Sequence, residues 1–453
     1  MQGACGEVFS TFRPLRPVDH GGDHGHPQWV MHLPSGAKSV AAVLAAVLLA
    51  SCGSPSTPTP APSPSPSQPS ESGALPSGSE GLAPSASPAP TPGHELYGFV
   101  PYWEMDDTIA AHLSTTPLST VGLFSVTNTS KGALNRSQNG YKAITGQVGA
   151  AMIAAAHQRG TRVELVFTSF GTSRNKKFFT DAALQTATIQ SLVALVGMLA
   201  IDGVNVDVEG LDIARAPAFG AFVGQLRAAV VAADAGDTVS IAAGAGPTGV
   251  AMASAAITNG ADRVFVMGYD YRTASSSPGA SAPVARSDDG RSLTWTLDLY
   301  AAAGIPPQKL LLGLPLYGNS WPVAGPVIGA PASGDGSVWI LRHHLDVLTN
   351  PAAVPQTDPI EAVDVYFLGS DGSMVAPSVD PSASVGASPT PAAAPTTWTA
   401  VYVDSPATLA IKMGLGESRG YAGAGFWAIG YERGLPGFTD LMTRFVAGAV
   451  PPA

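Results

Sequence analysis

Short apolar runs alternate with alanine-rich, helix-forming stretches between about residues 96 and 431. The runs are rich in β-branched and aromatic residues, which is typical of buried strands, and the stretches between them suit helices. This alternation predicts βα units on a parallel sheet. The predicted strands are 96–103, 121–127, 162–168, 203–209, 239–243, 263–271, 309–317 and 423–431. Eight units predict an α/β fold of the (β/α)8 TIM barrel type, with a doubly wound open sheet as the alternative.

One predicted strand carries polar residues on a single face. In 203–209, Asn205, Asp207 and Glu209 alternate with valines, so the three polar side chains lie on one side of the strand. Burying carboxylates costs several kcal/mol unless they are paired or hydrogen-bonded. The polar face therefore predicts a chemical site. Asp202 has the opposite parity, which leaves a structural and a chemical role equally open for it.

Polar and aromatic residues also cluster where the other predicted strands end. In a βα barrel the carboxyl ends of the strands meet at one face, where chemistry takes place. The residues placed there by the pattern are Tyr102, Trp103, Glu104, Tyr269, Asp270, Tyr317, Trp427 and Glu432. Trp321 and Trp339 follow the seventh strand and suit packing or a site equally well.

Charge and composition exclude several partners. The 453 residues include 33 acidic and 23 basic side chains, and this net charge of −10 argues against nucleic acid as a partner. A neutral polymer suits this charge, and we expect a monomer. The histidines, including His343 and His344, show no metal-ligand spacing, so we expect neither a metal nor another cofactor. We expect the histidine pair to cap or solvate a helix.

The N-terminal region resembles an export signal. An apolar run at 40–50 follows Lys38 and has the length of a signal-peptide core, and the sequence LASC after it is similar to a bacterial lipobox. Residues 1–52 are therefore predicted to be an extension plus a lipoprotein-type signal, with Met31 as the start and Cys52 as the lipidated residue. An ordinary secretory signal is the alternative. The predicted location is extracellular, anchored to the cell membrane through the lipid or secreted.

Two segments are too poor in large apolar residues to form a core. Residues 53–93 are rich in Pro and Ser and predict a disordered tether before a catalytic domain at 94–450. A second low-complexity segment, 376–395, lies in an insertion at 319–400 between the seventh and eighth strands. Because few residues follow it, a surface insertion is favoured over an interdomain linker. After Cys52 the sequence has no cysteine, so the domain forms no disulfide.

Five motifs, in chain order, resemble glycoside hydrolase family 18, the chitinase-like barrels. The sequence DGVNVDVE at 202–209 is similar to the DGxDxDxE signature of that family. The other four motifs are YGFVPYW at 97–103, MGYDY at 267–271, GLPLYG at 313–318 and GFWAIGYE at 425–432. The resemblance covers residues 96 to about 445 and implies a (β/α)8 barrel acting on N-acetylglucosamine glycans.

The spacing of the two carboxyls suits one form of glycosidic cleavage. Residues two apart on a strand lie about 6.6 Å from each other, so Asp207 and Glu209 sit side by side and do not flank a sugar. This disfavours two-carboxylate catalysis and favours substrate-assisted, retaining catalysis, in which the substrate's 2-acetamido oxygen attacks the anomeric carbon. Glu209 is then expected to be the acid and later the base. Asp207 is expected to hold the acetamido N–H and to raise the pKa of Glu209.

The resemblance implies roles for further residues. It implies that Tyr269 donates its hydroxyl to the acetamido carbonyl, that Asp270 steadies the same region, and that Trp427 forms the floor under the sugar. Because Tyr269 and Asp270 adjoin, a regular strand would point only one of them inward, and Tyr269 is favoured. Tyr102 and Tyr317 complete the expected substrate-binding set, together with Asn205.

Asn205 departs from the family signature, which has Asp at this position. The Asn form resembles the branch of spore-cortex and peptidoglycan glucosaminidases, so chitin, chitooligosaccharides and peptidoglycan all stay open as substrates. With one charge fewer, Asp207 is expected to ionise more readily. The alternative function is a catalytically inactive, carbohydrate-binding or cell-envelope protein of the same fold. Retention of Glu209, Asp207 and Tyr269 together favours the enzyme.

Overall fold

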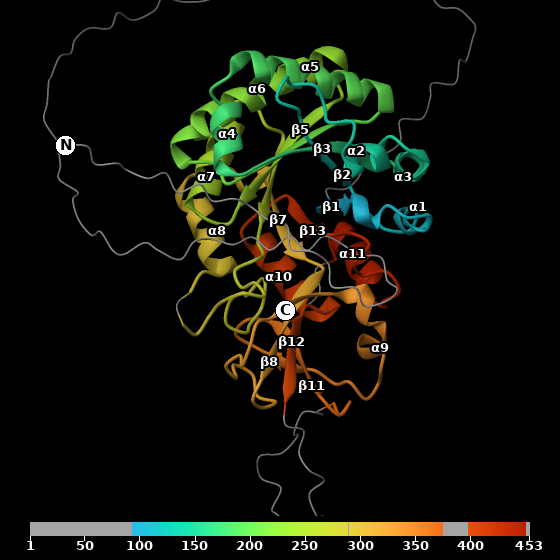
Figure 1. The fold of residues 1–453 in the computed structure, drawn as a ribbon, viewed down its shortest axis with the longest axis vertical. Coiled ribbons are helices and arrows are strands. Elements are labelled where there is room, and N and C mark those ends of the chain that lie inside the picture. The colour runs from blue at the N-terminus through green and yellow to red at the C-terminus, as the bar shows by residue number, and fades with distance from the viewer. Residues whose placement is uncertain (1–92, 289, 375–396, 450–453) are drawn as a thin grey trace, which may run out of the picture. The chain divides into compact units, whose positions relative to one another are not determined.

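A closed barrel of eight parallel strands forms the centre of the computed structural model, which describes residues 93–288, 290–374 and 397–449 (Figure 1). The strand order around the barrel is β1-β13-β7-β6-β5-β4-β3-β2. Its strands are β1 (Glu95–Pro101), β2 (Thr120–Val126), β3 (Arg162–Phe170), β4 (Gly203–Glu209), β5 (Thr238–Gly244), β6 (Arg263–Met267), β7 (Leu310–Pro315) and β13 (Gly423–Trp427). The predicted (β/α)8 barrel is therefore confirmed, and the open sheet is excluded.

Helices surround the barrel and connect its successive strands, except α9, which lies in the insertion, and α11, which follows β13 (Figure 1). They are α1 (Ile109–Leu113), α2 (Asn139–Ile144), α3 (Gln147–Gln158), α4 (Thr172–Phe178), α5 (Ala182–Leu199), α6 (Ala216–Ala233), α7 (Pro247–Thr258), α8 (Leu293–Ala302), α9 (Leu345–Leu348), α10 (Pro406–Ser418) and α11 (Phe438–Val446). Helix α5 and the segment Ile213–Ala233 that contains α6 are long and apolar enough to cross a membrane by composition. Both form part of the packed barrel, where Leu192 and Phe222 are fully buried, so we interpret them as core helices.

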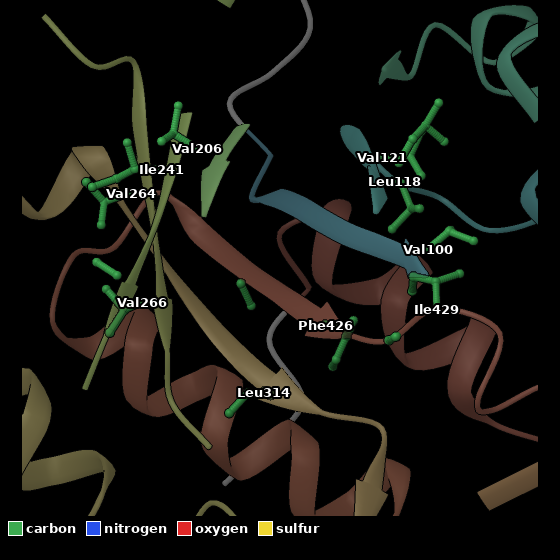
Figure 2. Close-up of a cluster of buried hydrophobic side chains, with 14 of the residues drawn as sticks. Val100, Leu118, Val121, Val206, Ile241, Val264, Val266, Leu314, Phe426 and Ile429 are labelled. Atoms are coloured by element: carbon green, nitrogen blue, oxygen red, sulfur yellow. The ribbon is translucent and has the colours of Figure 1, made fainter. Parts of the chain in front are cut away.

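The barrel strands bury apolar side chains on both faces, as parallel strands covered by helices do. One cluster lies between strands and helices and includes Val206, Ile241, Val266 and Leu314 (Figure 2). A separate cluster fills the barrel interior and consists of Tyr97, Phe99, Phe124, Val166, Phe265 and Leu311. Gly313 and Gly425 make room for Phe265, because a Cβ at either position would lie within 2.6 Å of its ring. The interior is thus packed, and polar residues there need specific partners.

The insertion between β7 and β13 contains a second, five-stranded antiparallel sheet. Its order is β10-β11-β12-β8-β9, with β8 (Tyr317–Val323), β9 (Ser337–Ile340), β10 (Gln356–Asp358), β11 (Val363–Gly369) and β12 (Trp398–Val403). The sheet has its own core around Trp321, Phe367 and Tyr402. A buried ion pair between Arg272, in the loop after β6, and Glu361 connects this sheet to the barrel. In Figure 1 it lies below β7 and β13.

Several predicted strands extend too far at their carboxyl ends. Strand β6 ends at Met267 rather than 271, β7 at Pro315 rather than 317, and β13 at Trp427 rather than 431. In each case apolar or aromatic residues continue into the following segment, which makes isolated backbone hydrogen bonds to the barrel, such as Leu316 N–H to Trp427 and Ile429 N–H to Phe99, without continuing the strand. The predicted signal, the tether at 53–93 except its last residue, and the segment 376–395 lie outside the described residues.

Candidate active site

Strand β4 directs Asn205, Asp207 and Glu209 toward the barrel interior. The valines between them are buried in the layer under the helices, whereas Asn205 Nδ2 donates to Ser240 Oγ of β5 at 2.7 Å. Asn205 is fully buried, Asp207 is 4% exposed, and Glu209 at the strand end is partly exposed. The three side chains therefore share one face, which leads from the closed interior to the accessible carboxyl end of the strand.

The two carboxyls hold protons more tightly than ordinary acids do. Burial, followed by the charge of Asp270, raises the pKa of Glu209 from 4.5 to about 7. Burial and then the charge of Glu209 raise the pKa of Asp207 well above its ordinary value. Burial therefore opposes the ionisation of Asp207 although residue 205 carries no charge. Both carboxyls therefore hold their protons to a higher pH than exposed acids do.

The loop after β6 brings both Tyr269 and Asp270 to the site. Because β6 ends at Met267, the alternation of a strand no longer separates them. Asp270 adopts a left-handed backbone with φ 60°, and its Oδ1 accepts a hydrogen bond from Tyr317 Oη at 2.5 Å. Ser281 Oγ accepts from the Asp270 backbone N–H at 3.1 Å and lies 3.5 Å from Asp270 Oδ1. The sequence prediction favoured Tyr269 over Asp270 because it assumed a regular strand through both residues, but β6 ends before them.

Tyr269 remains a neutral hydroxyl donor. Burial, followed by the charges of Asp207, Asp270 and Glu209, raises the pKa of its phenol well above 10. These charges place Tyr269 within electrostatic reach of all three carboxyls. Tyr317, predicted to contact substrate, is buried, and its hydroxyl supports Asp270.

Aromatic rings pack together at the carboxyl ends of β1, β2 and β13. Trp427 is partly buried, and its ring lies edge-on to Phe124 with centroids 4.7 Å apart. Trp103 contacts Trp427 and donates its Nε1 hydrogen to Tyr431 Oη at 3.0 Å. Tyr102 is half-buried with its ring 4.9 Å from that of Trp103. The aromatic residues predicted from the ends of the first and eighth strands thus form one connected group.

Two residues at this end of the barrel are missed by the sequence reasoning. Phe170 is 45% exposed and pairs with Glu209 in the β3–β4 register. Asn175 is fully buried on α4, where its Nδ2 donates to the backbone carbonyl of Glu209 at 2.6 Å and its Oδ1 accepts from Ser169 Oγ at 2.8 Å. The predicted third strand stops at 168, two residues before Phe170, and nothing in the sequence joins α4 to β4.

The family model for glycosyl hydrolases family 18 matches residues 98–432. The chain belongs to this family. A match to Nod factor hydrolase protein 1 of Medicago truncatula is 28% identical over 180 residues, covering 39% of this chain and 40% of that protein. The chain thus aligns with less than half of that curated relative.

Solved family 18 structures share the fold. A chitinase from Cycas revoluta, in complex with (GlcNAc)3, superimposes with a TM-score of 0.60 at 18% identity, covering 78% of this chain and 99% of that one. The spore cortex-lytic enzyme SleL of Bacillus cereus superimposes with a TM-score of 0.57 at 17% identity, covering 78% and 74%. At these identities, the likeness establishes the barrel and does not transfer a substrate.

Asp202, whose role the sequence left open, is structural in this family 18 barrel. Its Oδ2 accepts from the backbone N–H of Val163 at 2.7 Å and lies 2.9 Å from His157 Nε2. These contacts fix the chain just before β4 begins.

The tryptophans of the insertion and His344 also have packing roles. Trp321 and Trp339 are buried, and Trp339 stacks on His344. His344 precedes α9 as its N-cap residue, but its side chain makes no capping hydrogen bond. In the described part of the chain, no group of three or more His, Cys, Asp or Glu side chains is arranged to hold a metal ion. Cys52 lies outside the described residues.

Proposed function

We propose that this protein hydrolyses β-linked N-acetylglucosamine glycans by substrate-assisted, retaining catalysis. The observation that carries the proposal is Glu209, a partly exposed carboxyl whose pKa of about 7 lets it exist in both protonation states near neutral pH. Buried Asp207 lies beside it on the same strand face, and neutral Tyr269 lies within reach of both charges. Two carboxyls on one strand face suit a single acid aided by the substrate's own amide.

Each side chain has a separate task in this mechanism. Glu209 donates a proton to the leaving glycosidic oxygen, while the 2-acetamido oxygen of the substrate bonds to the anomeric carbon and displaces that oxygen. Asp207 accepts the acetamido N–H, and Tyr269 donates its hydroxyl hydrogen to the acetamido oxygen region. Glu209, now ionised, then takes a proton from the water that opens the cyclised intermediate. Trp427 and exposed Phe170 supply aromatic surface for sugar rings.

The proposal is tested with Glu209→Gln. We expect the natural protein to release products from N-acetylglucosamine oligomers and the variant to lose at least about 100-fold in kcat, because general acid–base catalysis contributes that much. Glu417→Gln, which changes a partly exposed glutamate of α10 paired with His94, is the matched control and should leave turnover unchanged. Sugar binding without turnover by the natural protein would support the non-catalytic alternative. A thiazoline analogue of the cyclised intermediate should compete with substrate.

The glycan source and the cellular location extend the proposal. Similarity to a chitinase and to a spore cortex-lytic enzyme supports both chitin-type oligomers and peptidoglycan as substrates. Parallel digestion of chitohexaose and purified peptidoglycan, with products sized, separates the two. We further propose that lipid on Cys52 anchors the protein to the cell membrane, supported by the lipobox-like sequence. Cys52→Ala should then move the protein from the membrane to the soluble fraction, and an unchanged distribution would contradict the anchor.

A further inference from the structure

A carboxyl that the proposed mechanism does not use is buried inside the barrel beneath the site. Glu164 on β3 is 3% exposed, and three hydroxyl groups surround its carboxyl. Tyr97 Oη donates to it at 3.0 Å, Thr238 Oγ1 at 2.9 Å and Ser240 Oγ at 2.5 Å. Three hydroxyl donors around one carboxyl are the environment of an ionised acceptor.

The direction of these hydrogen bonds determines how Asn205 is oriented. A serine hydroxyl has one hydrogen to donate, and Ser240 donates it to Glu164. Toward Asn205 it can therefore only accept, so Asn205 must present its Nδ2 group to Ser240, as it does at 2.7 Å. The Asn205 carbonyl oxygen consequently points away from Ser240.

Among the described residues, two buried oxygens on the same face of β4 are then left without a partner. Within the described part of the chain, neither Asn205 Oδ1 nor Asp207 Oδ1 has a hydrogen-bond partner. Asn205 and Asp207 are separated by one residue and share one face of β4, and burial raises the pKa of Asp207 well above its ordinary value, which favours its protonated form. An amide carbonyl is an acceptor, and a protonated carboxyl is the donor that suits it. A buried polar group without a partner costs about 1–3 kcal/mol, which favours their pairing.

The other charges near Glu164 come from the N-terminal ends of the strands. Glu95 of β1 forms an ion pair with Arg263 of β6. The pKa of Glu164 is raised overall, because burial raises it more than the three hydroxyl donors lower it, and the charge of Asp262 adds a smaller rise. These residues and Glu164 line a cavity of about 460 Å³ at the end of the barrel opposite the site. Ser240 Oγ hydrogen-bonds to both Glu164 and Asn205, so it links these two side chains directly.

We propose that Glu164 is a positioning residue for the reaction: through Ser240, it fixes the Asn205 amide so that its carbonyl oxygen accepts the proton of Asp207. This inference rests on the function proposed above and deepens it. With the Asn205 amide reversed, its N–H group would face Asp207 and compete for the carboxyl oxygen that must meet the substrate's acetamido group. The charge on Glu164 therefore acts on catalysis without contacting the substrate.

Kinetics of four variants test the proposal. Glu164→Gln and Ser240→Ala should each lower kcat about tenfold with KM unchanged within about twofold, the loss typical of a supporting hydrogen-bond partner. The double variant Glu164→Gln/Ser240→Ala should be no slower than the slower single variant, because both act through one link. Glu95→Gln is the control: Glu95 lies at the same end of the barrel but outside the hydrogen bonds that join Glu164, Ser240 and Asn205, so this variant should keep natural kcat.

Exchanging the carboxylate and the amide between positions 164 and 205 gives a rescue test. In Glu164→Gln/Asn205→Asp, the new amide can donate to Ser240, Ser240 can donate to the new carboxylate, and an oxygen again faces Asp207. We expect this variant to recover most of the kcat lost in Glu164→Gln. Natural kcat in Glu164→Gln and Ser240→Ala, losses that multiply in their combination, or no recovery in the rescue variant would each overturn the proposal.

A measurement without turnover separates this proposal from the proposed function. The Asn205 side-chain amide signal is identified by nitrogen-15 NMR as the one that disappears in Asn205→Asp. We expect this signal to shift in both Glu164→Gln and Ser240→Ala and to stay unchanged in Glu95→Gln. An unshifted signal in the first two variants would overturn the orienting role. If the natural protein hydrolyses no N-acetylglucosamine glycan, the function fails while this result still decides the role of Glu164.

Discussion

Replacing Asp270 with asparagine tests the electrostatic origin of the Glu209 pKa. The amide side chain keeps nearly the same shape, tolerates the left-handed backbone at this position, and can still accept a hydrogen bond from Tyr317. The substitution therefore removes the negative charge and leaves the local packing in place. Since that charge raises the pKa of Glu209, its loss must lower this pKa.

The structure limits how large the change can be. Burial and the Asp270 charge together raise the pKa of Glu209 from 4.5 to about 7, and burial is the larger cause. Asp270 thus accounts for less than half of the rise, so its removal should lower the pKa by about one at most. The pKa in the variant should lie near about 6 and well above the ordinary value for glutamate.

The assay is the pH dependence of kcat/KM on a soluble N-acetylglucosamine oligomer. Because Glu209 must carry a proton in the free enzyme, activity should fall as pH rises through about 7 in the natural protein and through about 6 in Asp270→Asn. Asp440→Asn, which removes an exposed charge from α11, should leave the profile in place. If the fall in activity on the basic side of the pH profile stayed in place or moved to higher pH, the reasoning would be refuted. If the pKa of Glu209 in the variant fell close to 4.5, charge rather than burial would be the larger cause of the rise.

Two further predictions concern stability. Asn175→Ala removes the donor to the Glu209 carbonyl and leaves Ser169 without its acceptor. It should therefore lower the free energy of unfolding, measured with denaturant, by about 1–3 kcal/mol and also lower kcat. Asn259→Ala, at an exposed helix end, should change neither quantity. The raised pKa of Glu209 stabilises the fold below pH 4.5, and this contribution is lost as pH rises to about 7. Glu209→Gln should therefore raise Tm by roughly 1–3 °C at about pH 8 and not at about pH 4; a gain of equal size at both values would contradict the charge argument.

The sequence was sufficient to predict the barrel and the polar face of β4. Each barrel strand is a short, mostly buried run; β-branched or aromatic residues mark most of these runs, whereas β7 is built mainly of leucines. The alternation in 203–209 required only the two-residue period of a strand to place Asn205, Asp207 and Glu209 together. Strand ends were less predictable, because Tyr269 and Ile429 continue the apolar pattern into segments that are no longer strands.

The supporting residues could not be predicted because they depend on register between strands and on loops. The bond from Asn205 to Ser240 exists because these residues are partners in the β4–β5 pairing. Asn175 reaches the end of β4 from the helix after β3, a contact with no sequence period behind it. The antiparallel sheet of the insertion was likewise missed, because β8 follows β7 after a single residue and because β9 and β10 have only four and three residues.

The neutral residue at 205 follows from the charge already present on the neighbouring strand. Glu164 and position 205 both lie in the barrel interior, and a single hydroxyl, that of Ser240, connects them. One serine hydrogen cannot satisfy two carboxylates, so an acid at 205 beside an ionised Glu164 would leave a buried negative charge with too few donors. An amide at 205 donates to Ser240 and still offers an oxygen on its other side. Asn205→Asp alone should therefore destabilise the fold. The same change combined with Glu164→Gln should not, because Ser240 can donate its hydrogen to only one buried carboxylate.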